Sequence, residues 1–367
     1  APLGPVLREY IVSSFMNMLN IPTTRSLAVA TTGEEVYRED VLPGAILTRV
    51  AQSHLRIGTF EYFAVRRDIE ALEILISFAI ERHFPEFLGD PHPAKKLLEC
   101  VLRRQSTLVA KWISVGFVHG VMNTDNTSIA GETIDYGPCA FIDTYRADKV
   151  FSSIDHAGRY AFMNQPDIVQ WNLAQLAQCL LPLIDEKTDS AVSIATDIIS
   201  RFPEIFAEDL GREFAHKLGL ACEPPQALRI AFELLELMSD HLADFTLTFR
   251  YLADAVPSDE AAGLFMQQFE QPTAVRDWLS QWRSRVSQDN QSMVTAQQKL
   301  LAANPAVIAR NHLVEEAIRS AEDHGNFAPF HELIAELGEP FTERSDQSKY
   351  VRPASPAEEV KMTFCGT

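Results

Sequence analysis

The residues with the clearest chemical potential lie in one stretch, FVHGVMNTDNTSIAGETIDYGP, which runs from Phe117 to Pro138. Asp125 and Asn126 are adjacent there, and Asp135 follows nine residues later. Carboxylate and amide oxygens suit Mg²⁺, which takes one or two protein carboxylates and completes its shell with phosphate oxygens and water. A carboxylate that does not hold the metal can accept the proton of an attacking hydroxyl. The stretch therefore predicts a site for a metal and a nucleotide, whereas NTDN alone would be typical of a surface turn.

The spacing in this stretch is that of the catalytic and metal loops of protein kinases, with one substitution. Kinases carry H-x-D-x-x-x-x-N, in which the aspartate is the base and the asparagine holds a metal, followed by a D-F-G motif. His119 and Asn126 keep this spacing, but Val121 occupies the position of the aspartate. Asp125 stands directly before Asn126 instead, and DYG supplies Asp135.

The residues around these loops have less specific signals. The segment TSIAGETI is predicted to form a short hairpin that brings Asn126 and Asp135 together. His119 is expected to hydrogen-bond the backbone as a structural residue and not to act as a base. Asp155 and His156 resemble an acid–base pair, but a structural or substrate-docking role is favoured for them.

The elements that position the loops are mostly helical. An apolar pattern predicts a first helix that ends near Asn20, and the β-rich segments RSLAVAT and GAILTRVA predict two strands. Apolar residues recur with a helical period over 94–115 until Gly116, and a second buried helix begins at NQPDIVQ, where proline favours initiation. Trp278 and Trp282, four positions apart, are expected to pack in the core.

These patterns predict an α+β fold that is mostly α, in three regions. Residues 1–60 form a small β-containing remnant, which the family resemblance described below assigns to a truncated kinase-like N-lobe. Residues 61–340 form a large helical C-lobe that carries the catalytic and metal loops. Residues 341–367 form a C-terminal tail rich in serine, proline and charge, which is expected to be loosely ordered until its last few residues.

Composition excludes several classes of protein. The 367 residues carry 50 acidic and 32 basic side chains, a net charge of −18, which argues against a surface for nucleic acid. No apolar run approaches the roughly 18 residues of a membrane span, so no membrane partner is expected. The five cysteines are far apart and form no zinc pattern, which fits a reducing, cytoplasmic setting.

The chain resembles the selenoprotein O (SelO/YdiU) family, kinase-like protein adenylyltransferases. The resemblance rests on ordered strings that span nearly the whole chain, among them LNIPTTRSLAV, VYRE, LTRVAQSHLRIGTFEYF, VGFVHGVMNTDNTSI, DYGP, NQPDIVQWNLAQLAQ and NPAVIARN. It implies a kinase-like fold and transfer of AMP from ATP to Ser, Thr or Tyr hydroxyls of protein substrates. It also implies an ATP bound in reversed orientation together with Mg²⁺ or, alternatively, Mn²⁺.

The resemblance gives a role to each residue of the two loops. Asp125 would accept the proton of the substrate hydroxyl, in place of the aspartate that Val121 replaces. Asn126 and Asp135 would hold the metal, and Asp135 would thereby also contact the nucleotide.

Three residues near the start of the chain complete the set that the resemblance implies. Glu9, a structural residue on the first helix, matches the glutamate that pairs with the family's nucleotide-binding lysine. Arg49 and Arg56 match two arginines that bind the terminal phosphate of the reversed ATP. Planar guanidinium groups suit that task because they bind phosphate oxygens in a bidentate manner.

Two departures from the family pattern affect the expected activity. The family's glycine-rich nucleotide loop and its lysine would precede the first helix and are absent from this sequence, so weak ATP binding and an unpaired Glu9 are expected. Phe151 occupies the position of an activation-segment cysteine that many members carry, which disfavours a redox clamp through Cys365; Cys139 could replace that cysteine only with a different loop geometry.

Two alternatives to adenylyl transfer stay open on the sequence. One is a kinase-type phosphotransferase, which would use the same loops with ATP in the usual orientation. The other is a pseudokinase, a non-catalytic nucleotide-sensing or interaction module.

Overall fold

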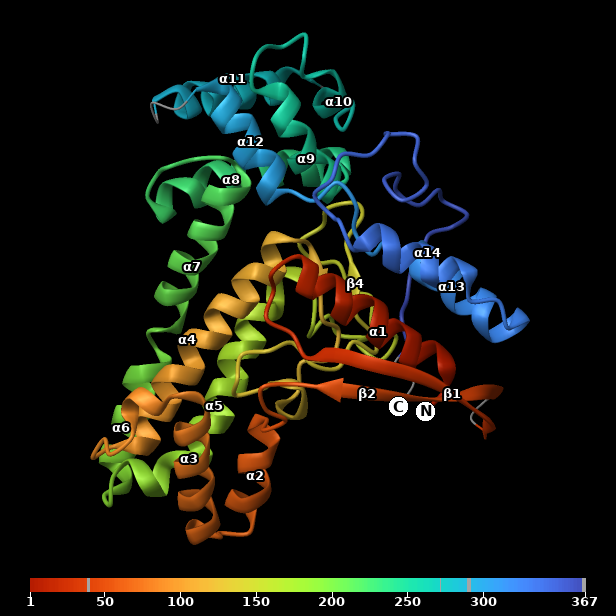
Figure 1. Ribbon diagram of the computed structural model, residues 1–367. Helices are drawn as coiled ribbons and strands as arrows, with labels where there is room; N and C mark the ends of the chain where they lie inside the picture. Colours follow the sequence, from red (N-terminus) through yellow and green to blue (C-terminus); the bar gives the residue numbers. More distant parts are fainter. Residues whose placement is uncertain (38–39, 271, 289–291, 365–367) are drawn as a thin grey trace.

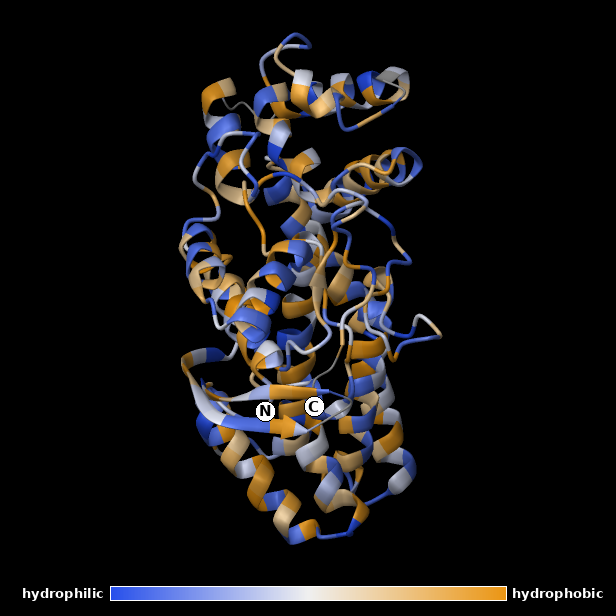
Figure 2. Ribbon diagram, turned by 90° about the vertical axis from the view of Figure 1, so that its right-hand side faces the viewer, coloured by the Kyte–Doolittle hydropathy of each residue, from blue (hydrophilic) through white to orange (hydrophobic). Residues whose placement is uncertain are grey.

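The computed structural model describes residues 1–37, 40–270, 272–288 and 292–364, and these form a mostly helical α+β fold (Figure 1). The described strands make two small antiparallel sheets, β1 with β2 and β3 with β4. This confirms the predicted class. Figure 2 shows hydrophobic and hydrophilic residues recurring along the same helices, as expected of amphipathic helices that bury one face.

Helix α1, Leu3–Met18, packs against a hairpin formed by β1, Arg25–Tyr37, and β2, Val41–Val50 (Figure 1). The predicted first helix and both predicted strands are confirmed; β1 continues past its predicted end at Thr31, and β2 begins before its predicted start at Gly44. In the register of the hairpin, Ser26 lies opposite Arg49 and Thr31 opposite Ala45. Leu7, Ile11 and Phe15 are buried on α1, which fixes this helix in the core.

The helical part that follows is built around α4, Pro93–Ser114. It packs against α5, Gln165–Ile184, and α7, Phe202–Lys217, and is accompanied by α2, Ile57–Val65, α3, Ile69–His83, and α6, Thr188–Ile199. The predicted helix over 94–115 is confirmed. The helix ends at Ser114, and Gly116, two residues further on, has a left-handed conformation (φ 73°), where a Cβ atom would lie 2.9 Å from side-chain atoms of Ile142 and Phe245.

The rest of the chain adds further helices, the last two of which pack against α1 (Figure 1). These are α8, Pro224–His241; α9, Phe245–Ala255; α10, Gly263–Met266; α11, Pro272–Gln288; α12, Met293–Ala303; α13, Asn311–His324; and α14, Ala328–Leu337. Trp278 and Trp282 of α11 stack with ring centroids 6.1 Å apart and are nearly fully buried, so their predicted core role is confirmed. No helix in the described part of the chain is long and apolar enough to cross a membrane.

The stretch that carries the candidate loops is closed at its base by a short sheet. Strand β3, Phe117–Val118, pairs with β4, Ala140–Phe141, and the 3₁₀ turn η2, Thr124–Asn126, lies between them. The predicted hairpin over TSIAGETI is wrong. Its two ends pair with other parts of the chain, Ser128 with Arg56 and Thr133 with Thr23. Backbone groups must find partners when buried, and here they find them far away in the sequence.

The C-terminal tail is anchored at two described points. The carbonyl oxygen of Val351 accepts a hydrogen bond from Arg310 Nε at 3.0 Å. Thr363 pairs in parallel with Ser152, and its hydroxyl donates to the carbonyl oxygen of Pro138 at 2.5 Å. The anchoring of Thr363 agrees with the ordering expected for the last few residues of the tail. Val351, in the part predicted to be loosely ordered, is buried and held by Arg310, so the prediction does not hold at that point.

The cysteine predictions receive partial answers. Cys365 lies outside the described residues. Cys139 is a free, buried cysteine whose thiol donates to the carbonyl oxygen of Tyr136 at 3.1 Å, and burial raises the pKa of this thiol. Phe151 is buried, and its carbonyl oxygen accepts a hydrogen bond from Thr363 N at 2.7 Å.

Candidate active site

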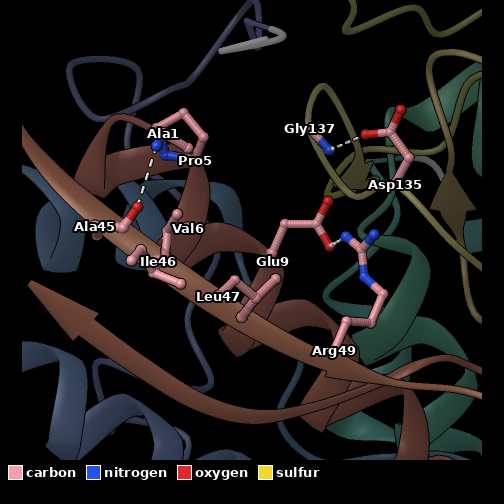
Figure 3. Close-up of a pocket in the computed structure, with 10 residues that line it drawn as sticks. All are labelled: Ala1, Pro5, Val6, Glu9, Ala45, Ile46, Leu47, Arg49, Asp135 and Gly137. Carbon is pink, nitrogen blue, oxygen red and sulfur yellow. Dashed lines mark hydrogen bonds and ion pairs between the residues drawn. The ribbon is translucent and has the colours of Figure 1, made fainter. Parts of the chain in front are cut away.

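A cavity of about 370 Å³ lies between α1, β2 and the DYG loop (Figure 3). We call it the Glu9 cavity. It is lined by ten residues: Ala1, Pro5, Val6, Glu9, Ala45, Ile46, Leu47, Arg49, Asp135 and Gly137. Three of the residues singled out from the sequence, Glu9, Arg49 and Asp135, therefore meet in one place although they are far apart along the chain.

The carboxylate of Glu9 is held by two donors. Its Oε2 accepts a hydrogen bond from Arg49 Nη2 at 2.7 Å, and its Oε1 accepts one from Tyr136 N at 2.9 Å. Figure 3 shows the Glu9 and Arg49 side chains pointing toward one another. Burial raises the pKa of Glu9, and the adjacent Arg49 opposes that rise. The expectation that Glu9 is unpaired here is wrong, because a buried carboxylate is costly unless it is paired and Arg49 on the facing strand supplies the partner.

Asp135 adopts a left-handed backbone conformation, with φ of 68°. This conformation is uncommon for a residue other than glycine, and aspartate tolerates it better than most because its side chain can hydrogen-bond nearby backbone. Here Oδ1 accepts a hydrogen bond from Gly137 N at 3.3 Å. Among the described residues nothing donates to Oδ2, so this oxygen is available to a ligand.

In the catalytic loop, the residue at the position of the kinase aspartate is buried, whereas the aspartate four residues later is exposed. Val121 is buried, with 8% of its surface exposed, whereas Asp125 is exposed on η2. The side-chain nitrogen of Asn126 donates to the carbonyl oxygen of Val121 at 3.1 Å. That bond fixes the orientation of the amide and leaves Asn126 Oδ1 without a donor in the described part of the protein.

His119 connects the two loops. Its Nε2 donates to the carbonyl oxygen of Ile134 at 2.9 Å, and its Nδ1 accepts from Val121 N at 3.4 Å. Burial lowers the pKa of this histidine, so the ring is neutral with its hydrogen on Nε2. The predicted structural role is confirmed. Asp135 and Asn126 are thus linked through His119, not through a hairpin between them.

Sequence reasoning missed a set of polar residues that support this arrangement. The side chain of Gln165 accepts from His119 N at 2.9 Å and donates to the carbonyl oxygen of Phe117 at 2.9 Å. The Tyr136 hydroxyl hydrogen-bonds that of Thr23, and Trp112 Nε1 donates to Thr133 Oγ1 at 2.9 Å. Thr23 and Gln165 lie in strings that match the family, but nothing in their local pattern indicates these contacts.

Arg56 lies outside the residues that line the Glu9 cavity. It precedes the first turn of α2, where its backbone pairs with Ser128 in the catalytic loop. Its Nε is buried and has no hydrogen-bond partner among the described residues. The structure therefore places Arg49 beside Asp135, and Arg56 beside the loop of Asp125 and Asn126.

Asp155 is engaged with its own turn. Its carboxylate accepts hydrogen bonds from Arg159 N at 2.8 Å and from Tyr160 N at 2.7 Å. Of the two roles favoured for this residue, the structural one is present.

Two oxygen atoms in the loops have the chemical character of magnesium ligands. Asn126 Oδ1 and Asp135 Oδ2 are two hard oxygen atoms with no protein donor in the described structure, and phosphate oxygens would complete a Mg²⁺ shell. Within the described ranges, no group of three or more His, Cys, Asp or Glu side chains could hold a metal by itself.

A mostly helical α+β fold with two polar loops beside an arginine-containing cavity suits an enzyme that transfers part of a nucleotide, and a family model described as protein adenylyltransferase SelO matches residues 3–338. This match identifies the protein as a nucleotidyltransferase. The chain belongs to the SelO family, whose members include proteins named YdiU.

Curated relatives agree with this assignment. The protein nucleotidyltransferase YdiU of Nitrobacter hamburgensis is 50% identical over all of this chain, which covers 72% of that relative. Those of Bradyrhizobium diazoefficiens and Rhodopseudomonas palustris strain HaA2 are 51% and 50% identical, with 74% and 75% of the relative covered.

Proposed function

We propose that this site transfers AMP from ATP to Ser, Thr or Tyr hydroxyls of protein substrates, with ATP reversed relative to its orientation in kinases. The observation that carries the proposal is the position of Arg49. Its guanidinium lies in the same cavity as Asp135, whereas Asp125 is not among the residues that line that cavity. A cation suited to phosphate thus lines the same cavity as the proposed metal ligand, and the proposed base is not part of that lining.

The reversed orientation is what the family resemblance implies, and the position of Arg49 supports it. In kinases the γ-phosphate faces the acceptor hydroxyl. The resemblance assigns the γ-phosphate to Arg49 and Arg56 and implies that the α-phosphate lies near Asp125. Of the two arginines, Arg49 is the one in the Glu9 cavity, which Asp125 does not line. The buried and unpaired Nε of Arg56 supports the role assigned to Arg56, because such a donor is costly unless a ligand accepts its hydrogen bond. Arg49 would have to exchange Glu9 for phosphate.

The proposed reaction breaks one bond to phosphorus and forms another. Asp125 accepts the proton of the substrate hydroxyl, and the hydroxyl oxygen attacks the α-phosphorus. The bond between the α-phosphorus and the oxygen that bridges to the β-phosphate breaks. Pyrophosphate leaves, and AMP is joined to the hydroxyl oxygen of the substrate protein. Asn126 and Asp135 would hold Mg²⁺, or alternatively Mn²⁺, which when bound would offset the negative charge of the phosphates.

The proposal includes the kinase-like architecture. Residues 61–340 would correspond to the C-lobe, residues 1–60 to part of the N-lobe and residues 341–367 to a tail. The contact of Glu9 with the DYG loop supports this, because a glutamate on a helix also faces the nucleotide site in kinases.

The test uses ATP labelled separately at its α- and γ-phosphates, with the full-length protein and an acceptor protein. We expect the α label to enter protein and the γ label to leave as pyrophosphate. The Asp125→Ala variant serves as the inactive control. Label that arrives only from the γ position would identify a kinase and refute the reversed orientation.

A further inference from the structure

The first turn of α2 forms a platform for the catalytic loop. Ile57 N donates to the carbonyl oxygen of Thr127 at 3.0 Å, and Ile129 N donates to that of Leu55 at 3.1 Å. Two backbone hydrogen bonds, one on each side of Ser128, thus fix the loop against the start of the helix. Neither involves a side chain that the proposed reaction uses.

Gly58, in this first turn, lies directly against the proposed base. A Cβ atom built on Gly58 would lie 2.3 Å from Asp125 Oδ1 and 3.0 Å from Asp125 Cγ. Both distances are shorter than the roughly 3.5 Å at which non-bonded heavy atoms attract. The backbone of Gly58 is helical, so alanine could adopt it. Glycine is needed here for space and not for an unusual conformation.

We propose that Gly58 is a positioning residue for Asp125: the absence of a side chain at position 58 leaves the space in which the carboxylate of the base sits. This inference rests on the proposed function, because it takes Asp125 as the proton acceptor. The N-terminal end of a helix carries partial positive charge, so the same turn also attracts the carboxylate that it accommodates.

A side chain at position 58 should move the base without unfolding the protein. The atom that it would meet is the end of a rotatable side chain, so the overlap can be relieved by rotation of Asp125. The three atoms nearest to a Cβ at position 58 all belong to Asp125. None belongs to Arg49, Asn126 or Asp135, which would bind the nucleotide and metal. A misplacement of about 1 Å in a reacting group can cost about 100-fold in rate.

The kinetic test compares two glycine variants in the full-length protein. Gly58→Ala should lower kcat for transfer of the α-phosphate by roughly 10- to 100-fold and leave KM for ATP within a few fold. Gly263→Ala is the matched control, since a Cβ there has nothing within 4 Å, and it should leave both constants unchanged. A raised KM with unchanged kcat, or no effect on either, would overturn the inference.

The second test needs no activity and uses the chain as it stands. In the native background, Gly58→Ala should lower the midpoint of thermal unfolding. In an Asp125→Ala background the overlap is absent, and the same change should be neutral or slightly stabilising because alanine favours a helix. Equal shifts in both backgrounds would refute the contact.

The two tests separate this inference from the proposed function. Normal transfer by Gly58→Ala together with loss of transfer in Asp125→Ala would reject positioning by Gly58 and leave the proposed function intact. No transfer of the α label by the unsubstituted protein would reject the proposed function and the catalytic role of the contact, while the thermal test would still decide whether the contact exists.

Discussion

At the scale of single residues, the ion pair between Glu9 and Arg49 occupies the one guanidinium group that lines the Glu9 cavity in the described structure. The pair spans 2.7 Å, and the two side chains are largely buried. Because Glu9 also accepts from Tyr136 N, the carboxylate ties α1, β2 and the DYG loop together. Under the proposed function, a triphosphate that reaches Arg49 would compete with this carboxylate, so the ion pair would lower the affinity for the nucleotide.

The two aspartates of the loops should differ in what they contribute. Asp135→Ala removes a proposed metal ligand and should abolish metal-dependent ATP binding by the full-length protein, measured by calorimetry. Asp125→Ala removes a base and should leave ATP affinity within a few fold while transfer falls by several orders of magnitude. Lost affinity in Asp125→Ala with none lost in Asp135→Ala would reverse the two roles.

At the scale of elements, α3 and α4 meet at a buried histidine. His83, in the last turn of α3, is buried, and its Nε2 has no partner among the described residues. Burial lowers the pKa of His83 to about 4, with Arg104 and Arg82 adding to the shift. The histidine is therefore neutral in the folded protein at pH 7.

This predicts a pH dependence of stability. The unfolded chain binds a proton near pH 6.5, whereas the folded chain does so only near pH 4, so the free energy of unfolding should fall as the pH drops through that window. In His83→Gln, the decrease in the free energy of unfolding between pH 7 and pH 5, measured by urea unfolding, should be smaller than in the unsubstituted protein by up to about 2 kcal/mol. The exposed histidine variant His324→Gln is the control. An unchanged slope in His83→Gln would contradict this assignment.

At the scale of the whole molecule, the tail joins segments far apart in sequence. Arg310, buried at the start of α13, contacts the carboxylates of Asp143 and Asp244 and the carbonyl oxygen of Val351. Thr363 then adds two backbone hydrogen bonds to the segment around Ser152. Thr363 N donates to the carbonyl oxygen of Phe151, and Ser153 N donates to the carbonyl oxygen of Thr363. The tail thereby holds the segment that follows the DYG loop.

Removing one hydroxyl should loosen this segment. Thr363→Val deletes the hydrogen bond to the carbonyl oxygen of Pro138 and should cost about 1 to 3 kcal/mol, because a buried acceptor loses its donor. Hydrogen exchange should show faster exchange of the Ser153 amide. Thr342→Val, which removes an exposed hydroxyl, is the control. Unchanged protection of Ser153 in Thr363→Val would show that the tail does not hold this segment.

The sequence by itself determined the family, the elements with a strong local pattern and the spacing of the polar residues in the two loops. Helix α4 and the strands of the hairpin follow from local periodicity, and the sequence places Asp125, Asn126 and Asp135 by their spacing alone. Such features depend on residues only a few positions apart in the sequence, so they can be predicted without knowledge of the tertiary structure.

Only the tertiary structure decided how these residues meet. The partner of Glu9 is Arg49, 40 positions away, and the link between the loops is His119 with Ile134. The anchoring of Thr363 at Pro138 spans 225 positions, and the space for Asp125 is left by a glycine on another element. These contacts arise because buried charges and backbone groups take whatever partner the packing brings within reach, and that choice has no local signature in the chain.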